Sequence, residues 1–208
     1  MKYRIKFSKK GEAAFLGHLE LINVLKTGFR RAGLFLIYSQ GFHPHPKLSF
    51  GKALSVGIES ECEFCDLELL ENISSQQIRE KCAQVFPQGI KIKEVSEIAP
   101  ESLAIEDSIK ASIYEISNMG IAIDQLKATM ASFDHQDLFL FELERKKKSN
   151  KINLKDYVAE LALLENNDIR IQLLEKQPMV RIQEVIQALF GLEGIELKKI
   201  FIMKREVN

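Results

Sequence analysis

The segment from Gly41 to Gly51 places two imidazoles, two prolines and a lysine within a few residues, flanked by aromatic rings. Each proline fixes its own φ and biases the residue before it towards an extended backbone. His43 and His45 are therefore expected to be extended, and an extended i, i+2 pair projects from one side of the chain. Such a stiff loop can present imidazoles and a cation to a ligand. The alternative is a proline-rigid surface loop with solvated histidines, because loops collect these residue types in any case.

A third histidine, His18, lies in a segment whose apolar residues recur at three- and four-residue steps over residues 12–32. This spacing predicts an amphipathic helix with Phe15 and His18 on its apolar stripe. If His18, His43 and His45 converge, they suit a metal site or general acid–base catalysis. The alternative for His18 is a hydrogen-bonded core residue. These three histidines are the candidate catalytic residues, and no metal ligand is assigned.

The zero net charge of the chain conceals a strong asymmetry. Residues 1–52 contain ten lysines and arginines against two acidic residues, whereas residues 53–107 contain four basic and twelve acidic residues. A basic face attracts phosphate-rich polymers whatever the total charge is. The alternative is that the two segments lie side by side and neutralise each other.

Cations combined with aromatic rings are typical of sites that bind single-stranded RNA. The candidate RNA-binding residues are Lys2, Arg4, Lys6, Arg30, Arg31, Tyr38, Gln40, Phe42, His43, His45, Lys47, Ser49 and Phe50. Arg30 and Arg31 also end the predicted helix, whose C-terminal dipole favours cations for purely structural reasons. A second basic run, Arg145 to Lys148 with Lys151, is interpreted as a solvated hairpin tip, with phosphate contact as the alternative.

The three cysteines, Cys62, Cys65 and Cys82, are an odd number that suits a reducing compartment better than a disulfide framework. Cys62 and Cys65 have C-x-x-C spacing, but they fall in a predicted strand, where residues three apart face opposite sides. No second pair completes a four-cysteine zinc site. Nucleotide-binding glycine motifs, the nucleophile elbow and the three-cysteine cluster of radical S-adenosylmethionine enzymes are also missing. We therefore expect no cofactor, and a non-catalytic protein rather than an enzyme.

The elements that position these residues repeat in the two halves of the chain. In the first half, strands are expected at 2–8, 34–38, 62–70 and 89–95, with helices at 12–32 and 74–86. In the second, strands are expected at 110–118, 137–145, 157–164, 168–175 and 195–205, with helices at 122–133 and 180–190. The order is βαββαβ twice, with one additional strand. It predicts the α+β class, with a tandem pair of ferredoxin-like units in antiparallel sheets, over residues 1–97 and 108–208 and joined by a polar linker.

The first residues alternate between polar and apolar side chains, as in a half-buried strand, and contain no signal-peptide block. No apolar run approaches the roughly 18 residues of a membrane span. We therefore expect a cytoplasmic protein with no membrane partner.

Several segments of the first half share their sequence pattern with a known protein family. They are Tyr3–Lys9, Phe15–Leu21, Phe29–Leu34, Tyr38–Phe50 and Val56–Ser60. Together they resemble the radical SAM-linked protein family, a bacterial domain of unknown function that is fused to, or encoded beside, a radical S-adenosylmethionine protein. The likeness is specific over residues 3–70 and collinear to the C-terminus. Gly17 stands where serine is more usual, and Glu20 where aspartate is.

The resemblance implies a cytosolic partner of a radical S-adenosylmethionine iron–sulfur enzyme, without an established activity. Combined with the basic face, it predicts an accessory protein that binds tRNA or rRNA through the N-terminal residues and the His/Pro loop. One alternative is a histidine-dependent RNA-processing or metal-dependent enzyme that uses His18, His43 and His45. Another is a protein–protein scaffold whose acidic segment docks the partner enzyme.

Overall fold

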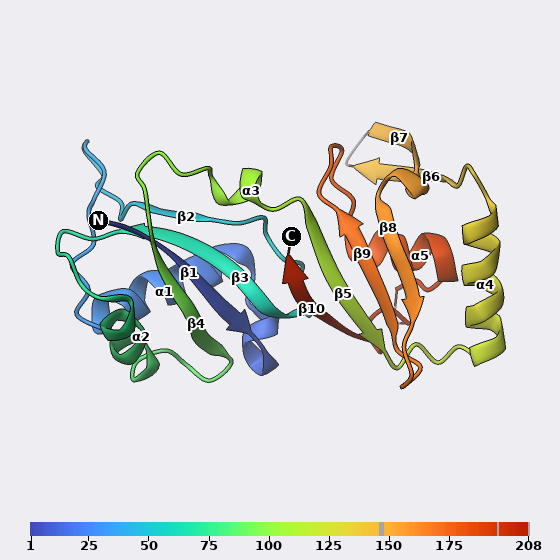
Figure 1. Ribbon diagram of the computed structural model, residues 1–208, viewed down its shortest axis with the longest axis horizontal. Coiled ribbons are helices and arrows are strands. Elements are labelled where there is room, and N and C mark those ends of the chain that lie inside the picture. Colours follow the sequence, from blue (N-terminus) through green and yellow to red (C-terminus); the bar gives the residue numbers. More distant parts are fainter. Residues whose placement is uncertain (146–147, 195, 208) are drawn as a thin grey trace. The chain divides into compact units, whose positions relative to one another are not determined.

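The structure, a computed structural model, describes residues 1–145, 148–194 and 196–207. The chain divides into two units, Met1–Ser108 and Ile109–Asn208, which Figure 1 shows in blue to green and in green to red.

The first unit combines an antiparallel sheet with helices. Its strands are β1 (Lys2–Lys9), β2 (Leu48–Phe50), β3 (Glu59–Glu68) and β4 (Ile90–Ile98). Its helices are the 3₁₀-helix η1 (Gly11–Phe15), α1 (His18–Arg31), α2 (Ser75–Ala83) and α3 (Ile105–Ser108). β1 lies between β4 and β3, and the short β2 pairs with β3, all antiparallel.

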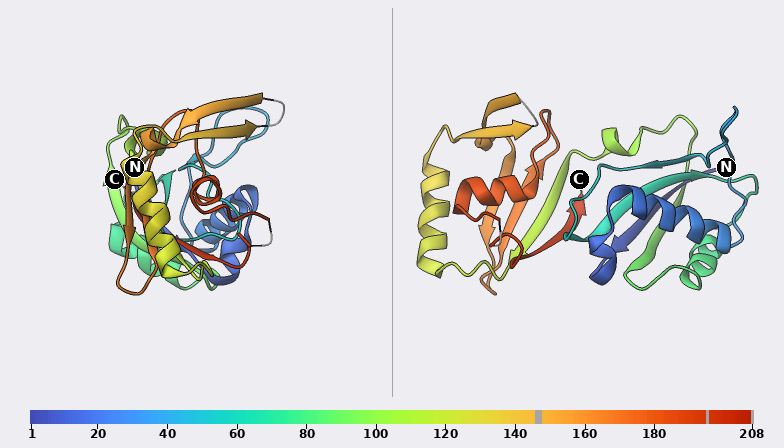
Figure 2. Two further views of the ribbon diagram at one scale, coloured as in Figure 1. Left: turned by 90° about the vertical axis from the view of Figure 1, so that its right-hand side faces the viewer. Right: turned by 180° about the vertical axis from the view of Figure 1, so that it is seen from behind.

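The core of this unit lies between the sheet and the helices α1 and α2, which cover one face of the sheet (Figures 1 and 2). The predicted alternation of β1 is confirmed, because Tyr3, Ile5 and Phe7 are buried. Gly28 of α1 allows a close approach to the segment that follows α2, since a Cβ there would lie 2.4 Å from the ring of Phe86. α2 begins where the helix over 74–86 was expected to begin: Ser74 and Gln77 exchange two hydrogen bonds in a capping box.

The predicted helix over residues 12–32 is two helices, η1 and α1. The chain is extended at Leu16 and Gly17, and the Gly17 amide donates to Glu20 Oε2 at 2.7 Å, which starts α1. The expectation that Phe15 and His18 lie on a buried stripe is wrong: Phe15 is 69% exposed and His18 is exposed in the first turn of α1. The break shifts the helical register, so that the buried stripe begins at Leu21.

Two further segments of the first unit differ from what the sequence predicts. The strand expected at 34–38 consists of isolated bridges, Leu36 with Leu69 and Tyr38 with Pro46. The segment expected as a linker, 96–108, contains the end of β4 and the short helix α3. The first segment is thus less regular than expected, and the second belongs to the first unit and is not a linker between the units.

The second unit also contains an antiparallel sheet, in the order β10-β5-β9-β8. These strands are β5 (Ala111–Ser117), β8 (Val158–Leu163), β9 (Ile169–Leu174) and β10 (Phe201–Val207). The helices are α4 (Ile123–His135), the 3₁₀-helix η2 (Leu154–Asp156) and α5 (Ile182–Phe190). α5 is buried along Ile182, Val185, Ile186 and Leu189 and ends at Gly191, whose φ is +67°.

β6 (Leu140–Arg145) and β7 (Lys148–Asn153) pair antiparallel in a separate two-stranded sheet, which contains Arg145, Lys148 and Lys151 of the second basic run. The sequence analysis did not predict β7. Arg145, at the end of β6, pairs with Glu184 at the start of α5. Lys146 and Lys147 lie outside the described residues, as does Ile195, where the last strand was expected to begin.

The α+β class and the mostly antiparallel pairing are confirmed. Within the described ranges, none of the helices has the length and apolar character needed to cross a bilayer.

Candidate nucleic-acid interface

The His/Pro segment forms a hairpin that leads into β2. The Ser39 amide donates to the His45 carbonyl at 2.8 Å, and the His45 amide donates to Ser39 Oγ at 3.0 Å. Tyr38 and Pro46 form the next bridge. These contacts close the hairpin below its tip, residues 40–44. In Figure 1 this tip is the light-blue segment between α1 and β2 that extends away from the sheet.

The base of the hairpin is fixed to β3 by backbone hydrogen bonds. The Ile37 amide donates to the Glu68 carbonyl at 2.9 Å, and the Glu68 amide donates to the Lys47 carbonyl at 3.3 Å. The Lys47 amide donates to Ile37 at 2.7 Å across the hairpin. Because β3 is a central strand of the first unit, the tip is displayed on a firmly anchored base.

The side chains of the tip are exposed. Phe42 has a relative exposure of 102%, and Gln40, His43 and His45 are also exposed. Tyr38, just below the tip, is 42% exposed. The aromatic ring of Phe42 is thus fully available to a ligand, with hydrogen-bonding groups beside it.

Phe50 differs from Phe42 because it is partly buried and packs against the core of the first unit. His18 contacts Phe50 edge-on, with 6.1 Å between the ring centroids and an interplanar angle of 84°. Both rings also line a small cavity of about 10 Å³, roughly the room that one water molecule needs. The structure therefore brings together His18 and Phe50.

Among the described residues, no contact joins His18 to His43 or His45. The part of the chain that the structure describes contains no group of three or more His, Cys, Asp or Glu side chains arranged to hold a metal ion. The exposed position of His43 and His45 at the hairpin suits binding of a ligand from solvent, and His18 contacts Phe50 instead.

Three of the candidate RNA-binding residues lie around one hollow. Lys2 of β1, Lys47 and Ser49 line a cavity of about 200 Å³, together with Asp66 and Glu68 of β3. Lys47 Nζ pairs with Glu68 Oε2 at 3.2 Å, and Lys2 Nζ donates to the Pro100 carbonyl at 3.4 Å. Both ammonium groups have further hydrogen atoms to donate.

The other candidate cations differ in their surroundings. Lys6 pairs with Glu94 at 3.0 Å on the surface. Arg4 is bound by Asp66, whose hydrogen bonds raise the pKa of the guanidinium against the opposing effect of burial. Arg30 and Arg31 are exposed in the last turn of α1, where the helix dipole favours them.

Sequence reasoning missed a buried lysine next to His18. Lys9 is 1% exposed, and its Nζ donates to the Ala14 carbonyl of η1 at 3.1 Å. Burial lowers the pKa of Lys9, and the nearby Glu63 carboxylate partly offsets this. Lys9 is two residues beyond Phe7 in β1, so the alternation that buries Tyr3, Ile5 and Phe7 also places Lys9 on the buried face. Continuing the alternation one residue beyond the strand expected at 2–8 would have identified it.

Residues 2–187 match a family described as an uncharacterized protein conserved in bacteria (DUF2344), and the chain belongs to this family. No curated protein matches the chain.

Proposed function

We propose that this member of the bacterial family binds single-stranded RNA through the hairpin and the adjacent basic residues of its first unit. The observation that carries the proposal is the complete exposure of Phe42 at the tip of an anchored hairpin. Single exposed apolar residues are common on protein surfaces. A ring displayed beside Tyr38, Gln40 and two histidines is, however, the combination on which unpaired bases stack and form hydrogen bonds.

The hollow beside the hairpin supplies the phosphate contacts in this proposal. Lys47 and Glu68 are about half and one third exposed, and pairs of this kind contribute little to stability. A phosphate oxygen can therefore replace Glu68 as the partner of Lys47 at little cost. Lys2 and Ser49 line the same hollow and provide an ammonium group and a hydroxyl. Arg30 and Arg31 add cations that extend the electrostatic attraction.

We further propose that the protein is a cytoplasmic accessory of a radical S-adenosylmethionine iron–sulfur enzyme in RNA modification or ribosome-linked metabolism. The resemblance of residues 3–70 to the radical SAM-linked family supports this partner. The hairpin then engages RNA, while exposed acidic residues such as Glu71, Glu97 and Glu101 offer a surface for the enzyme. Copurification of the enzyme from the native host tests the partnership.

The fold proposed for both units is the ferredoxin-like βαββαβ arrangement. In the first unit β1 lies between β4 and β3, with β2 beside β3, and in the second the order is β10-β5-β9-β8. The first-unit helices α1 and α2 connect strands and cover one face of their sheet (Figure 2). These features support the proposal of two similar units.

The experiment for RNA binding compares two exposed phenylalanines. Fluorescence anisotropy with a labelled, unstructured oligoribonucleotide gives the affinity of the wild type, Phe42→Ala and Phe15→Ala. Loss of a base–aromatic stack costs about 1–3 kcal/mol, or roughly 5- to 150-fold in Kd. We expect this loss for Phe42→Ala alone, because Phe15 is also exposed but lies on η1. Equal effects of both changes, or no binding at low salt, contradict the proposal.

Salt dependence tests the phosphate contacts separately. Each neutralised phosphate of a single strand releases about 0.7 counterions, so affinity falls as salt is raised. Changing Arg30 and Arg31 together to Ala is expected to flatten the logarithmic slope by about one to two units. If the slope is unchanged, Arg30 and Arg31 do not contact phosphates and only stabilise the end of α1.

A further inference from the structure

A cavity of about 600 Å³ lies where β1 ends and β4 begins. Its volume is within the roughly 300–1,000 Å³ of typical small-molecule sites. Three lysines line it, Lys10, Lys91 and Lys93, together with Glu12, Glu61 and Gln88. The candidate RNA-binding hollow lies at the other end of β1, beside Lys2. At a strand rise of about 3.3 Å per residue, Lys2 and Lys10 are roughly 26 Å apart.

A glycine fixes the close approach that forms this cavity. Gly89 precedes β4 with a φ of +93°, and a Cβ there would lie 2.2 Å from the Lys10 carbonyl oxygen. The Lys10 amide donates to the Gly89 carbonyl at 2.9 Å. The end of β1 and the start of β4 are therefore in direct backbone contact, which places Lys10 beside the lysines of β4.

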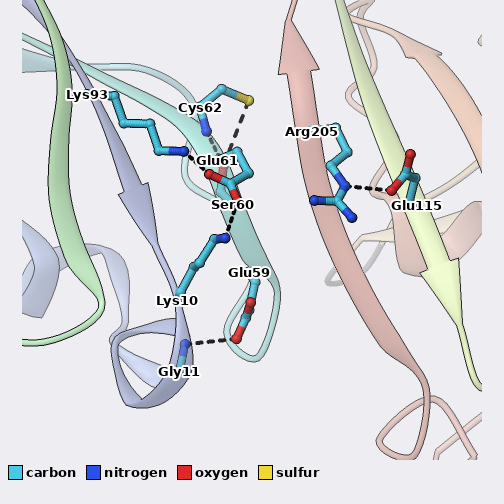
Figure 3. Close-up of polar contacts among 9 residues, drawn as sticks. All are labelled: Lys10, Gly11, Glu59, Ser60, Glu61, Cys62, Lys93, Glu115 and Arg205. Carbon is cyan, nitrogen blue, oxygen red and sulfur yellow. Dashed lines mark hydrogen bonds and ion pairs between the residues drawn. The ribbon is translucent and has the colours of Figure 1, made fainter.

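Two of the lysines share one carboxylate. Figure 3 shows Lys10 and Lys93 on either side of Glu61, each with its ammonium group directed to one carboxylate oxygen. The hydrogen bonds from both lysines lower the pKa of Glu61 to about 2, so Glu61 is charged at neutral pH. One carboxylate neutralises one ammonium group, and each ammonium carries three donors. Because Glu12 also lines the cavity, the positive charge that remains is that of one lysine, and the exposed Lys91 adds further donors.

We propose that this cavity binds the phosphate groups of a nucleotide-sized small molecule. The ammonium groups of Lys10, Lys91 and Lys93 bind the phosphate oxygens. The remaining volume accommodates the rest of the ligand, and the Gln88 amide is available to it. This site is separate from the RNA-binding hairpin, and the two proposals do not depend on each other.

Titration calorimetry at low ionic strength tests the site with two probes, inorganic pyrophosphate and ADP. We expect both probes to bind, and Lys93→Ala to weaken binding about tenfold through the loss of a charge-assisted contact. Glu61→Gln is expected to strengthen binding several-fold, because it removes the anion that competes for the lysines. Lys6→Ala is the matched control: Lys6 pairs with Glu94 and does not line the cavity.

Lys91→Ala provides a second variant that leaves the Lys10–Glu61–Lys93 arrangement intact, and it is expected to weaken binding in the same direction. Tighter binding of ADP than of pyrophosphate identifies a nucleotide ligand, and equal affinities identify an oligophosphate group as the recognised part. Absence of binding by both probes overturns the proposal, as does an equal loss in Lys6→Ala and Lys93→Ala. A parallel loss of oligoribonucleotide affinity in Lys93→Ala also overturns it, because the lysines are then part of the RNA surface.

Discussion

The guanidinium of Arg4 and the carboxylate of Asp66 form a two-point ion pair, with 2.8 Å between Nε and Oδ1 and 3.0 Å between Nη2 and Oδ2. Asp66 is 2% exposed. Arg4 also donates to the Leu103 carbonyl at 2.8 Å and to Ser108 Oγ at 3.2 Å. One side chain therefore joins β1 to β3 and to the segment that follows β4.

Replacement of Arg4 by Met is expected to lower the free energy of unfolding by about 3 kcal/mol, because it leaves the buried Asp66 carboxylate without its cation. Chemical denaturation measures this change. Lys6→Met is the control on the same strand: its pair with Glu94 is exposed, and such pairs contribute about 0–1 kcal/mol. Equal small losses in both variants contradict a structural role for Arg4.

The pH dependence of stability is expected to report on Glu61. The pKa of Glu61 is about 2 in the folded protein and has an ordinary value of 4.5. Because folding lowers this pKa, the carboxylate stabilises the protein fully above pH 4.5, and this contribution is lost as pH falls towards 2. The wild type is thus more stable than Glu61→Gln at neutral pH, and the difference narrows between pH 4.5 and 2. Denaturation curves at several pH values measure it; a constant difference contradicts the prediction.

The thiols are expected to be unreactive in the folded protein. Cys62, Cys65 and Cys82 are buried, and burial raises the pKa of Cys65 and raises that of Cys82 to about 12. Reaction needs the thiolate and access to it. A thiol reagent such as DTNB at neutral pH should therefore label the native protein slowly and the denatured protein at all three positions. Rapid labelling of the native protein, or stoichiometric iron and sulfide after anaerobic reconstitution, is the contrary result.

The prolines of the hairpin are expected to affect binding more than stability. Pro44 is exposed in the tip, and Pro46 lies just below it. Changing both to Ala leaves few buried contacts altered, so the melting temperature should change little. The loop then has more conformations to lose on binding, which should weaken RNA binding several-fold. A clearly lower melting temperature with unchanged RNA affinity would show that the two prolines stabilise the fold and do not contribute to binding.

Much of the fold follows from local patterns. The alternation of β1 predicts its buried face, and the serines at 74 and 75 predict the start of α2. The break at Gly17 was missed because periodicity was extended back through η1, although Gly17 with Glu20 has the spacing of a cap. Local spacing alone therefore located the helix but misplaced its beginning.

The candidate site depends more strongly on long-range pairing. The exposure of Phe42 is consistent with a segment rich in glycine and proline. The pairing of Arg4 with Asp66, by contrast, depends on the register between β1 and β3. The Lys10–Glu61–Lys93 arrangement combines residues from or beside three strands. Charge counts identify such residues as basic or acidic, but only the strand register shows which of them meet.

The most direct measurement of RNA binding by the hairpin is photo-crosslinking of the full chain to an unstructured oligoribonucleotide that contains 4-thiouridine, followed by mass spectrometry of the linked peptides. The account predicts cross-links in the peptide that contains Tyr38, Phe42 and His43, and their loss in Phe42→Ala but not in Phe15→Ala. Cross-links confined to the second unit, or a pattern unchanged in Phe42→Ala, would contradict it.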